Sequence, residues 1–195
     1  MKHLTKTVVL VLAIAVVLTG CKQPTQLIND VQAAVDKVTS AGADKYAAEE
    51  LKAINDDLGK ALGEIDVQGK KFFKKFGPAK DMLAAVQAKV AELEAALPAK
   101  IEAVKNAAVQ LQGEAQAALT EAAELLKKAP KGKGTAKDLQ ALQADLTGAE
   151  TLFTEIQTAL DTQDYLGAAD KAKTVKDRVA AITEQVNAAI AKVKR

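Results

Sequence analysis

The chain has almost none of the side chains that enzymes use as nucleophiles and metal ligands. Its 195 residues include no tryptophan, one serine (Ser40), one cysteine (Cys21) and one histidine (His3). If residues 1–20 are removed as a signal peptide, the mature chain has no imidazole at all. Serine–histidine and cysteine–histidine nucleophiles, histidine-ligated zinc and CxxC redox centres are therefore excluded.

Motifs that bind phosphate groups are also missing. No GxGxxG or GxxxxGK(S/T) occurs, because KGKGT at 131–135 has its glycines at the wrong spacing. The carboxylate pairs Glu49–Glu50 and Asp56–Asp57 are adjacent along an expected helix, so the two members of each pair do not face a common point. We therefore predict that the protein is not an enzyme and that it holds no cofactor and no metal.

An excess of charge of one sign is missing as well. The full chain has 27 basic and 25 acidic residues, and loss of residues 1–20 removes Lys2 and Lys6. The mature protein would then carry 25 charges of each sign and be close to neutral. Such a balance provides no electrostatic footprint for nucleic acid, so we predict that nucleic acid is not a partner.

What the sequence does contain, at its start, is the pattern of a secretory signal. Lys2 and Lys6 provide a positively charged n-region, and Val8–Leu18 is an unbroken apolar run. An α-helix of this length spans about 16 Å, well short of the ~30 Å hydrocarbon core of a bilayer. We therefore expect residues 1–20 to be a cleaved signal peptide rather than a membrane-spanning anchor.

The four residues LTGC at 18–21 resemble the lipobox of bacterial lipoproteins. In that family the signal is cut before the cysteine, whose sulfur carries diacylglycerol and whose new amino group is often acylated. The resemblance implies lipidation of Cys21, with residues 21–24 as a lipidated tether, and more than one acyl chain anchors a protein stably. Lys22 stands where enterobacterial lipoproteins retained at the inner membrane carry Asp. The resemblance therefore favours the outer membrane, at its periplasmic face or at the cell surface.

Glycine and proline, the residues that most often interrupt a helix, are scarce, with 11 and 4 in the whole chain. From Gln26 onward apolar residues recur at steps of three and four, and no alternation of period two occurs. We predict five helices. They are expected over 25–38, over 47–76, over 78–128, and over two further segments that carry Leu139 to Leu160 and Ala172 to Val193.

The longest predicted helix contains Pro98. The apolar seam shifts at Leu93, Leu97 and Ile101, where two steps of four follow one another. Proline removes one helical hydrogen bond, so we expect the helix to be kinked at Pro98. The stretch APKGKGTAKD at 129–138 is the clearest predicted loop.

Two of the predicted helix pairs repeat each other. A shift of 88 residues places the pattern of 48–61 on that of 136–149, acidic residues included. A shift of 89 places Phe76 on Tyr165 and continues through the following helix. The sequence GADKYAAEELKA at 42–53 resembles the entry to the TPR-like helical hairpins of bacterial lipoproteins. That family is largely without a known activity, so the resemblance implies architecture only.

These patterns predict an all-α fold, an elongated antiparallel helical bundle or coiled coil with a thin, alanine-rich core. Two duplicated helical hairpins would be joined by the long helix. Residues 25–130 would hold the leading helix, the first hairpin and the connecting helix, and residues 131–195 the second hairpin. Because aromatic residues are only 3% of the chain, close packing of helices has to supply the stability.

The segment GKKFFKKFGPAK at 69–80 combines five lysines with three phenylalanines. On a helix, the aromatic side chains would share one face and lysines would flank it, as in an interfacial helix or a site for anionic lipid headgroups or glycan. The alternative is a hairpin end whose aromatic residues cap the core. This alternative is favoured because the corresponding turn at 160–167 is acidic and still contains an aromatic residue. The candidate anionic-surface site consists of Lys70, Lys71, Phe72, Phe73, Lys74, Lys75 and Phe76.

The sequence thus predicts a non-enzymatic, lipid-anchored envelope protein. It would act as a spacer or protein-interaction module at the outer membrane, with protein partners in the envelope. The alternative is a binding protein for anionic lipid, or for peptidoglycan or another cell-wall polymer.

Overall fold

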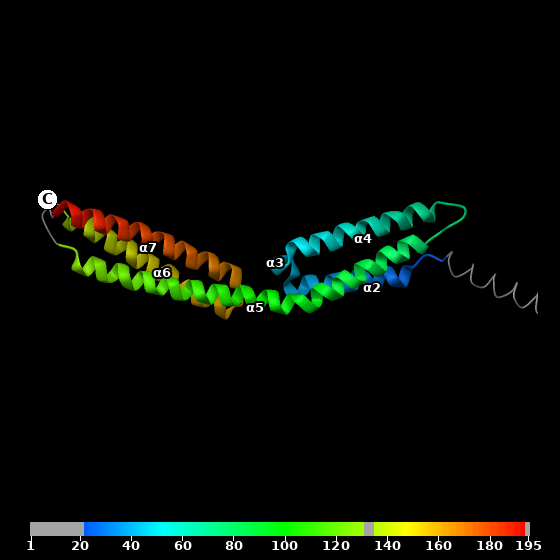
Figure 1. The fold of residues 1–195 in the computed structure, drawn as a ribbon, viewed down its shortest axis with the longest axis horizontal. Helices are drawn as coiled ribbons and strands as arrows, with labels where there is room; N and C mark the ends of the chain where they lie inside the picture. Colours follow the sequence, from blue (N-terminus) through cyan, green and yellow to red (C-terminus); the bar gives the residue numbers. More distant parts are fainter. Residues whose placement is uncertain (1–21, 131–134, 194–195) are drawn as a thin grey trace, which may run out of the picture. The chain divides into compact units, whose positions relative to one another are not determined.

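In the computed structural model the chain is all α-helical, which confirms the predicted fold class. The structure describes residues 22–130 and 135–193, and within these residues it contains helices and no strand (Figure 1). The predicted signal peptide at 1–20 and Cys21 lie outside the described residues. The elements are α2 (Thr25–Val38), the π-helical turn η1 (Thr39–Ala43), α3 (Asp44–Tyr46), α4 (Ala48–Gly69), α5 (Gly77–Lys128), α6 (Ala136–Asp161) and α7 (Tyr165–Val193).

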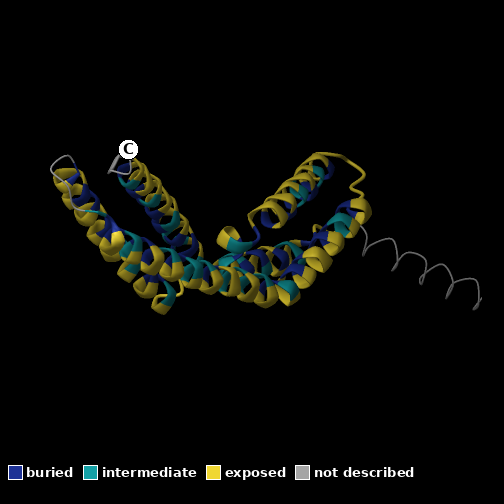
Figure 2. Ribbon diagram, turned by 60° about the vertical axis from the view of Figure 1, so that its left-hand side comes forward, coloured by how far each residue is buried: buried dark blue, intermediate teal, exposed yellow. Residues whose placement is uncertain are grey.

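The chain divides into two compact units, Met1–Lys100 and Ile101–Arg195. Unit 1 contains α2, α4 and the first part of α5, and unit 2 contains the rest of α5 together with α6 and α7. In each unit the buried residues lie between the helices and the exposed residues cover the outside (Figure 2). Each unit is therefore a small bundle of three long helices with a core of its own.

In unit 1, α2 and α5 run in the same direction and α4 runs against both (Figure 1). Ion pairs between helices agree with this arrangement. Lys37 near the end of α2 pairs with Glu94 of α5 at 2.5 Å, and Asp57 of α4 pairs with Lys89 of α5 at 2.6 Å. Between the helices lies a core of aliphatic side chains at helical spacing: Val31, Val35, Val38, Leu51, Ile54, Leu58, Ala61, Ile65, Ala79, Leu83, Val86, Val90, Leu93 and Leu97.

The chain passes from α2 to α4 through η1 and α3, where the sequence predicts a break. Gly42 has a φ of +100°, and a Cβ at this position would lie 3.3 Å from the ring of Tyr46. Glycine adopts this conformation at no steric cost, whereas a residue with a side chain would be strained. The break therefore consists of a π-helical turn and one short helical turn.

The core of unit 2 is built from leucine, isoleucine, valine and many alanines, whose small side chains let helix axes approach closely. Partly exposed ion pairs also link the three helices. Lys171 of α7 pairs with Glu155 of α6, and Lys176 of α7 pairs with Glu114 of α5. The buried cluster consists of Ala108, Ala115, Leu119, Ala122, Leu126, Ala129, Leu139, Leu142, Leu146, Ala149, Ile156, Ala159, Ala168, Ala169, Ala172, Val175, Val179, Ile182 and Val186.

Burial repeats between the two units in the register that the sequence predicts. Helix α4 begins at Ala48, and α6 begins 88 residues later at Ala136. The second helices of the two pairs also begin 88 residues apart, α5 at Gly77 and α7 at Tyr165. The aromatic residues match at the predicted shift of 89, because Phe76 directly precedes α5 and Tyr165 is the first residue of α7. Five buried residues of α4 have buried counterparts in α6: Leu51, Ile54, Leu58, Ala61 and Gln68 correspond to Leu139, Leu142, Leu146, Ala149 and Ile156.

The same shift extends the repeat beyond the two predicted hairpins. Residues 25–38, which form α2, fall on residues 113–126 in the second part of α5. Val31 and Val38 are buried, and so are their counterparts Leu119 and Leu126. The repeating element is therefore a bundle of three helices, in which the first helix of unit 2 is continuous with the last helix of unit 1.

Helix α5 continues through Pro98 as a single helix. Because proline has no N–H, the carbonyl of Glu94 lacks its usual helical donor. Pro98 is exposed, so its ring stays clear of the core. The boundary between the units follows at Lys100, and the predicted kink at Pro98 stays a prediction.

Candidate functional site

The candidate anionic-surface site forms the loop between α4 and α5. Helix α4 ends at Gly69 and α5 begins at Gly77, so residues 70–76, here called the basic loop, connect the two helices of the hairpin. The predicted helix through this segment is wrong. A helix would stack Lys70 on Lys74 and Lys71 on Lys75, and like charges four residues apart destabilise a helix.

The three phenylalanines of the basic loop do not share a face. Phe76 is 1% exposed and belongs to the core of unit 1. Phe72 and Phe73 are 93% and 79% exposed, and their rings meet edge to face with centroids 5.0 Å apart. The predicted capping role is therefore confirmed for Phe76 and wrong for Phe72 and Phe73, which project from the end of the hairpin.

A residue that the sequence analysis missed, Gln68, ties the basic loop to α4. Its side chain is 7% exposed, and its Nε2 donates to Oε1 of Glu64 at 2.6 Å. Its Oε1 accepts from the backbone N–H of Lys75 at 3.3 Å, and its carbonyl accepts from the N–H of Lys71 at 3.1 Å. The signal in the sequence is a polar residue at a position of the apolar stripe, seven residues after Ala61.

The lysines of the basic loop all face solvent. Lys70 pairs with Asp66 of α4 at 2.6 Å. No carboxylate within residues 22–130 and 135–193 pairs with Lys71, Lys74 or Lys75. The loop has no acidic residue, so Lys71, Lys74 and Lys75 present positive charge without a paired carboxylate, next in sequence to two exposed rings.

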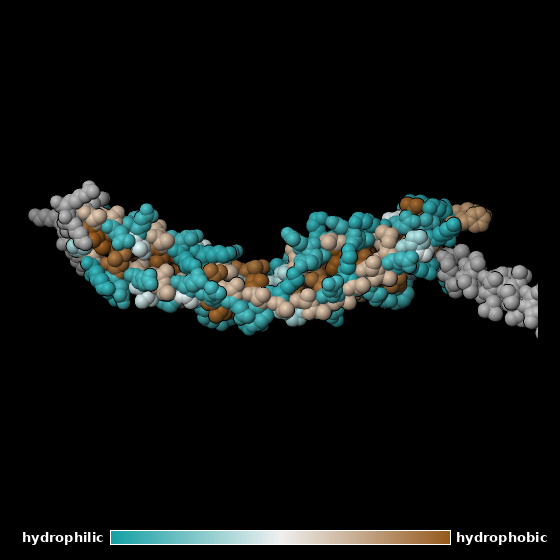
Figure 3. Space-filling model, in the orientation of Figure 1, coloured by the Kyte–Doolittle hydropathy of each residue, from teal (hydrophilic) through white to brown (hydrophobic). Residues whose placement is uncertain are grey.

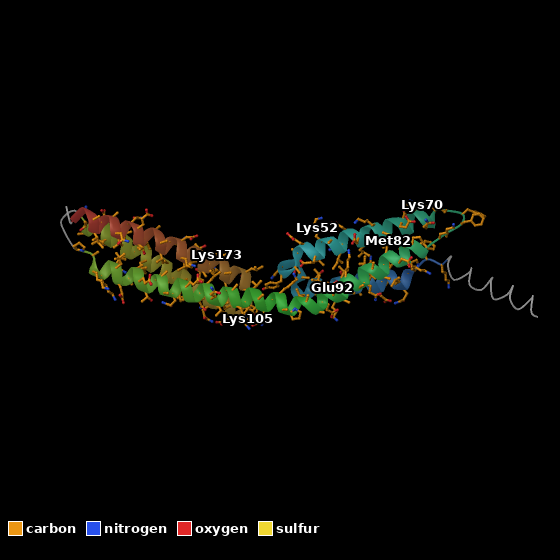
Figure 4. All side chains as sticks on the ribbon, viewed as in Figure 1. Lys52, Lys70, Met82, Glu92, Lys105 and Lys173 are labelled. Carbon is orange, nitrogen blue, oxygen red and sulfur yellow. The ribbon has the colours of Figure 1, made fainter. Side chains whose placement is uncertain are left out.

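The basic loop lies at the same end of unit 1 as the N-terminal end of α2 (Figure 1). This follows from the parallel course of α2 and α5, because the loop leads directly into the first turn of α5. Figure 4 shows Lys70 at this end, beside the loop, and Figure 3 shows the apolar tip projecting past the hydrophilic sides of the unit. The described chain therefore begins close to the end of the bundle that carries the exposed rings.

Three exposed or partly exposed carboxylates join neighbouring helices. Hydrogen bonds from Lys60 at 2.7 Å and from Lys89 at 2.6 Å lower the pKa of Asp57 to about 2. A hydrogen bond from a lysine likewise lowers the pKa of two glutamates: Glu50 with Lys100, and Glu114 with Lys176. Of the predicted adjacent carboxylate pairs, the structure thus uses Glu50 and Asp57 in ion pairs between α4 and α5.

Shallow grooves run between helices. Two lie between α5 and α6: one of about 560 Å³ is lined by Leu126, Leu139 and neighbouring residues, and one of about 420 Å³ by Leu119, Phe153 and neighbouring residues. A third, about 400 Å³, lies between α4 and α5 and is lined by Ile54, Leu93 and charged residues. In the described part of the chain, no group of three acidic, histidine or cysteine residues is placed to hold a metal ion. None of the described helices has both the length and the apolar composition needed to cross a bilayer.

No family model matches the sequence, and no curated protein or solved structure is similar to the chain. The function therefore has to be inferred from the residues and their arrangement.

Proposed function

We propose that this protein is a non-enzymatic, lipid-anchored protein of the bacterial envelope. Acyl chains on Cys21 would hold it at the outer membrane, where it acts as a spacer or protein-interaction module. One observation carries the proposal: α2 begins at Thr25, four residues after the lipobox cysteine. Four residues of extended chain reach at most ~14 Å, so the anchor would hold unit 1 directly at the membrane surface.

The ionised side chains support a structural rather than a catalytic role. General acids and bases work best with a pKa near the working pH. The lysine partners of Glu50, Asp57 and Glu114 instead lower the pKa of each carboxyl, which keeps it ionised at neutral pH. Each of these carboxylates joins two helices of its unit, as expected of groups that hold a scaffold together.

Mass spectrometry of the native protein purified from membranes tests the anchor. We expect a mature chain that starts at Cys21 and carries a diacylglycerol group on its sulfur. An unmodified sulfur, or a chain that still carries residues 1–20, would contradict the proposal. Crosslinking in intact cells tests the interaction role, because an interaction module should yield a reproducible envelope protein partner that survives high salt.

A second candidate function, the binding of anionic lipid or of a cell-wall polymer, is favoured by the exposure of the basic loop. Co-sedimentation of the lipid-free protein with anionic vesicles or with peptidoglycan tests it. Replacement of Lys70, Lys71, Lys74 and Lys75 by Gln should reduce the bound fraction, and an unchanged bound fraction would contradict this function.

A further inference from the structure

The basic loop places two large apolar rings in water at the end of unit 1. Phe72 and Phe73 are 93% and 79% exposed, although the same loop buries Phe76. In the last turn of α4, Val67 is also 48% exposed. Removal of apolar surface from water is the main favourable term in most associations, so two exposed rings in mutual contact mark a surface that is buried in a bound state.

The charge of the loop indicates what buries these rings. Lys71, Lys74 and Lys75 flank them in the sequence, are exposed, and have no carboxylate partner among the described residues. An apolar tip flanked by ammonium groups on long, flexible stems matches the headgroup region of an anionic bilayer. The rings would reach the boundary of the acyl chains while the lysines remain at the phosphate groups.

The geometry of the rings favours a bilayer over a sugar polymer. The planes of Phe72 and Phe73 are 85° apart, so the two rings offer no common flat face on which a row of sugars could stack. Phenylalanine also has no donor or acceptor for the hydroxyl groups of a glycan, whereas the acyl boundary of a membrane requires none.

The position of the loop adds a second, independent argument. The loop and the N-terminal end of α2 lie at the same end of unit 1 (Figure 1). A chain held by acyl groups on Cys21 would keep this end within about 14 Å of the membrane surface. The loop would therefore meet the same leaflet at a high effective concentration, and even a weak contact would be formed.

We infer that the basic loop is a second, non-covalent membrane contact of unit 1. Phe72 and Phe73 insert into the headgroup region of a bilayer that contains anionic phospholipid, and Lys71, Lys74 and Lys75 bind the phosphate groups. That the loop shares a leaflet with the acyl chains on Cys21 rests on the proposed function, whereas insertion of the loop does not. Two attachment points limit the rotation of unit 1 about its tether and turn this end of the bundle toward the membrane.

Binding of the lipid-free chain of residues 22–195 to vesicles tests the insertion. This chain should fold, because the buried residues of both cores lie between Val31 and Ala189. We expect it to bind vesicles with 30% phosphatidylglycerol more tightly than neutral phosphatidylcholine vesicles, with an affinity that falls as salt rises. A double change, F72S with F73S, should weaken binding by roughly tenfold per ring.

The lysines are tested with a matched control. Replacement of Lys71, Lys74 and Lys75 by Gln should weaken binding by about fivefold per lysine. The same change in charge in unit 2, at the exposed Lys127, Lys137 and Lys173, should leave binding unchanged. Equal losses in both triple variants would show a non-specific charge effect and overturn the inference. The inference would also be overturned if the wild type did not bind vesicles, or if the F72S and F73S double variant bound them as tightly as the wild type. Binding of the wild type to peptidoglycan but not to vesicles would overturn it too.

A single tryptophan reports the depth of insertion directly, because the chain contains no other tryptophan. In an F73W variant, we expect the emission to shift to the blue on vesicle binding and to be quenched by brominated lipids. The control is L166W in the first turn of α7, where the side chain is 40% exposed and where the emission should not respond. An unshifted F73W emission at saturating lipid would overturn the inference.

Failure of the loop and failure of the anchor give different results. If the protein is acylated at Cys21 but the F73W emission does not shift when vesicles are added, only the inference about the loop is contradicted. A protein with an unmodified Cys21 whose loop still binds anionic vesicles contradicts the anchoring and leaves the insertion standing.

Discussion

The phenylalanines at 72, 73 and 76 have opposite environments although they lie within five residues of one another. Phe76 directly precedes α5 and closes the end of the unit 1 core, where it is 1% exposed. Its counterpart Tyr165, at the start of α7, is partly buried as well. One aromatic residue at the start of the second helix therefore belongs to the repeated architecture. Phe72 and Phe73 have no equivalent in the shorter turn of unit 2.

This division predicts different effects on stability. Replacement of Phe76 by Ala should lower the free energy of unfolding by about 3–5 kcal/mol, because it removes a buried ring and leaves a cavity. Replacement of Phe72 or Phe73 by Ala should change it by less than about 0.5 kcal/mol, because both rings are exposed. Urea unfolding followed by circular dichroism measures all three, and a large loss for F72A would contradict the structure.

The ion pairs of Asp57 predict how stability depends on pH. The pKa of Asp57 falls from 3.8 to about 2 in the folded protein because Lys60 and Lys89 donate hydrogen bonds to its carboxylate. A carboxyl with a depressed pKa stabilises the fold above its unfolded pKa and loses that contribution as the pH falls toward its folded pKa. The stability lost in D57N should therefore be constant above about pH 5 and should vanish between about pH 4 and pH 2.

Urea midpoints of the wild type and of D57N, measured from pH 7 to pH 2, give this difference directly. Since the carboxylate is partly exposed, the difference should be small and should shrink at high salt. A difference that persists at pH 2 would show that Asp57 acts through something other than its charge.

At the scale of the elements, the turn between α6 and α7 is defined by specific backbone and side-chain hydrogen bonds. Gln163 has a φ of 61°, and the N–H of Asp164 donates to the carbonyl of Ala159 at 2.8 Å. The N–H of Gln163 donates to Leu160 at 3.1 Å, so α6 ends in the paired hydrogen bonds of a Schellman motif. Oδ1 of Asp164 then accepts from the N–H of Gly167 at 3.2 Å, which caps the start of α7. One short turn thus ends one helix and begins the next.

The left-handed residue in this turn makes a prediction for unit 2. A side chain at positive φ costs roughly 1–2 kcal/mol, a cost that glycine does not have. Q163G should therefore raise the free energy of unfolding by about 1 kcal/mol, after allowance for the greater freedom of glycine in the unfolded chain. Q163A keeps the steric cost and serves as the control. An equal gain in both variants would point to the glutamine side chain rather than to the backbone.

Considered as a whole molecule, the protein consists of two bundles with separate cores that share one helix. Helix α5 supplies the last helix of unit 1 and the first helix of unit 2. The repeat of burial every 88 residues links the units in sequence, while each core is completed within its own unit. The two units should therefore respond separately to damage in either core.

Matched core substitutions test this independence. Leu83 in unit 1 and Leu146 in unit 2 are both 0% exposed, so replacement of either by Ala should cost about 2–5 kcal/mol in its own unit. In L146A, amides of α6 and α7 should lose protection from hydrogen exchange while those of α2 and α4 keep theirs, and L83A should show the reverse. Loss of protection in both units from one substitution would show that the molecule unfolds as a single cooperative unit.

Much of this arrangement could be predicted from the sequence because it depends on local periodicity. The start of α4 and the stripe from Leu51 to Ile65 follow from apolar residues at steps of three and four. The duplication was predicted from acidic and aromatic residues that match as well. The predicted loop over 129–138 was too long, because α6 already begins at Ala136. The site was predicted only in part. The four lysines were identified, but the helix through them and the shared face of the rings were wrong, and Gln68 was missed. The course of the chain through the basic loop and the burial of its side chains depend on contacts between segments, and the spacing of apolar residues contains no information about those contacts.

The sequence by itself determined that the chain folds into helices, where these lie except over residues 70–76, which of their faces are apolar, and that one end of the first hairpin is rich in lysine and phenylalanine. Only the tertiary structure decided that Phe76 enters the core while Phe72 and Phe73 face water, and that the second part of α5 serves as the first helix of unit 2. The physical reason is that helix formation follows from residues three and four apart. Whether a side chain at a helix end is buried depends instead on which other helix reaches that end, and no spacing along one segment contains that information.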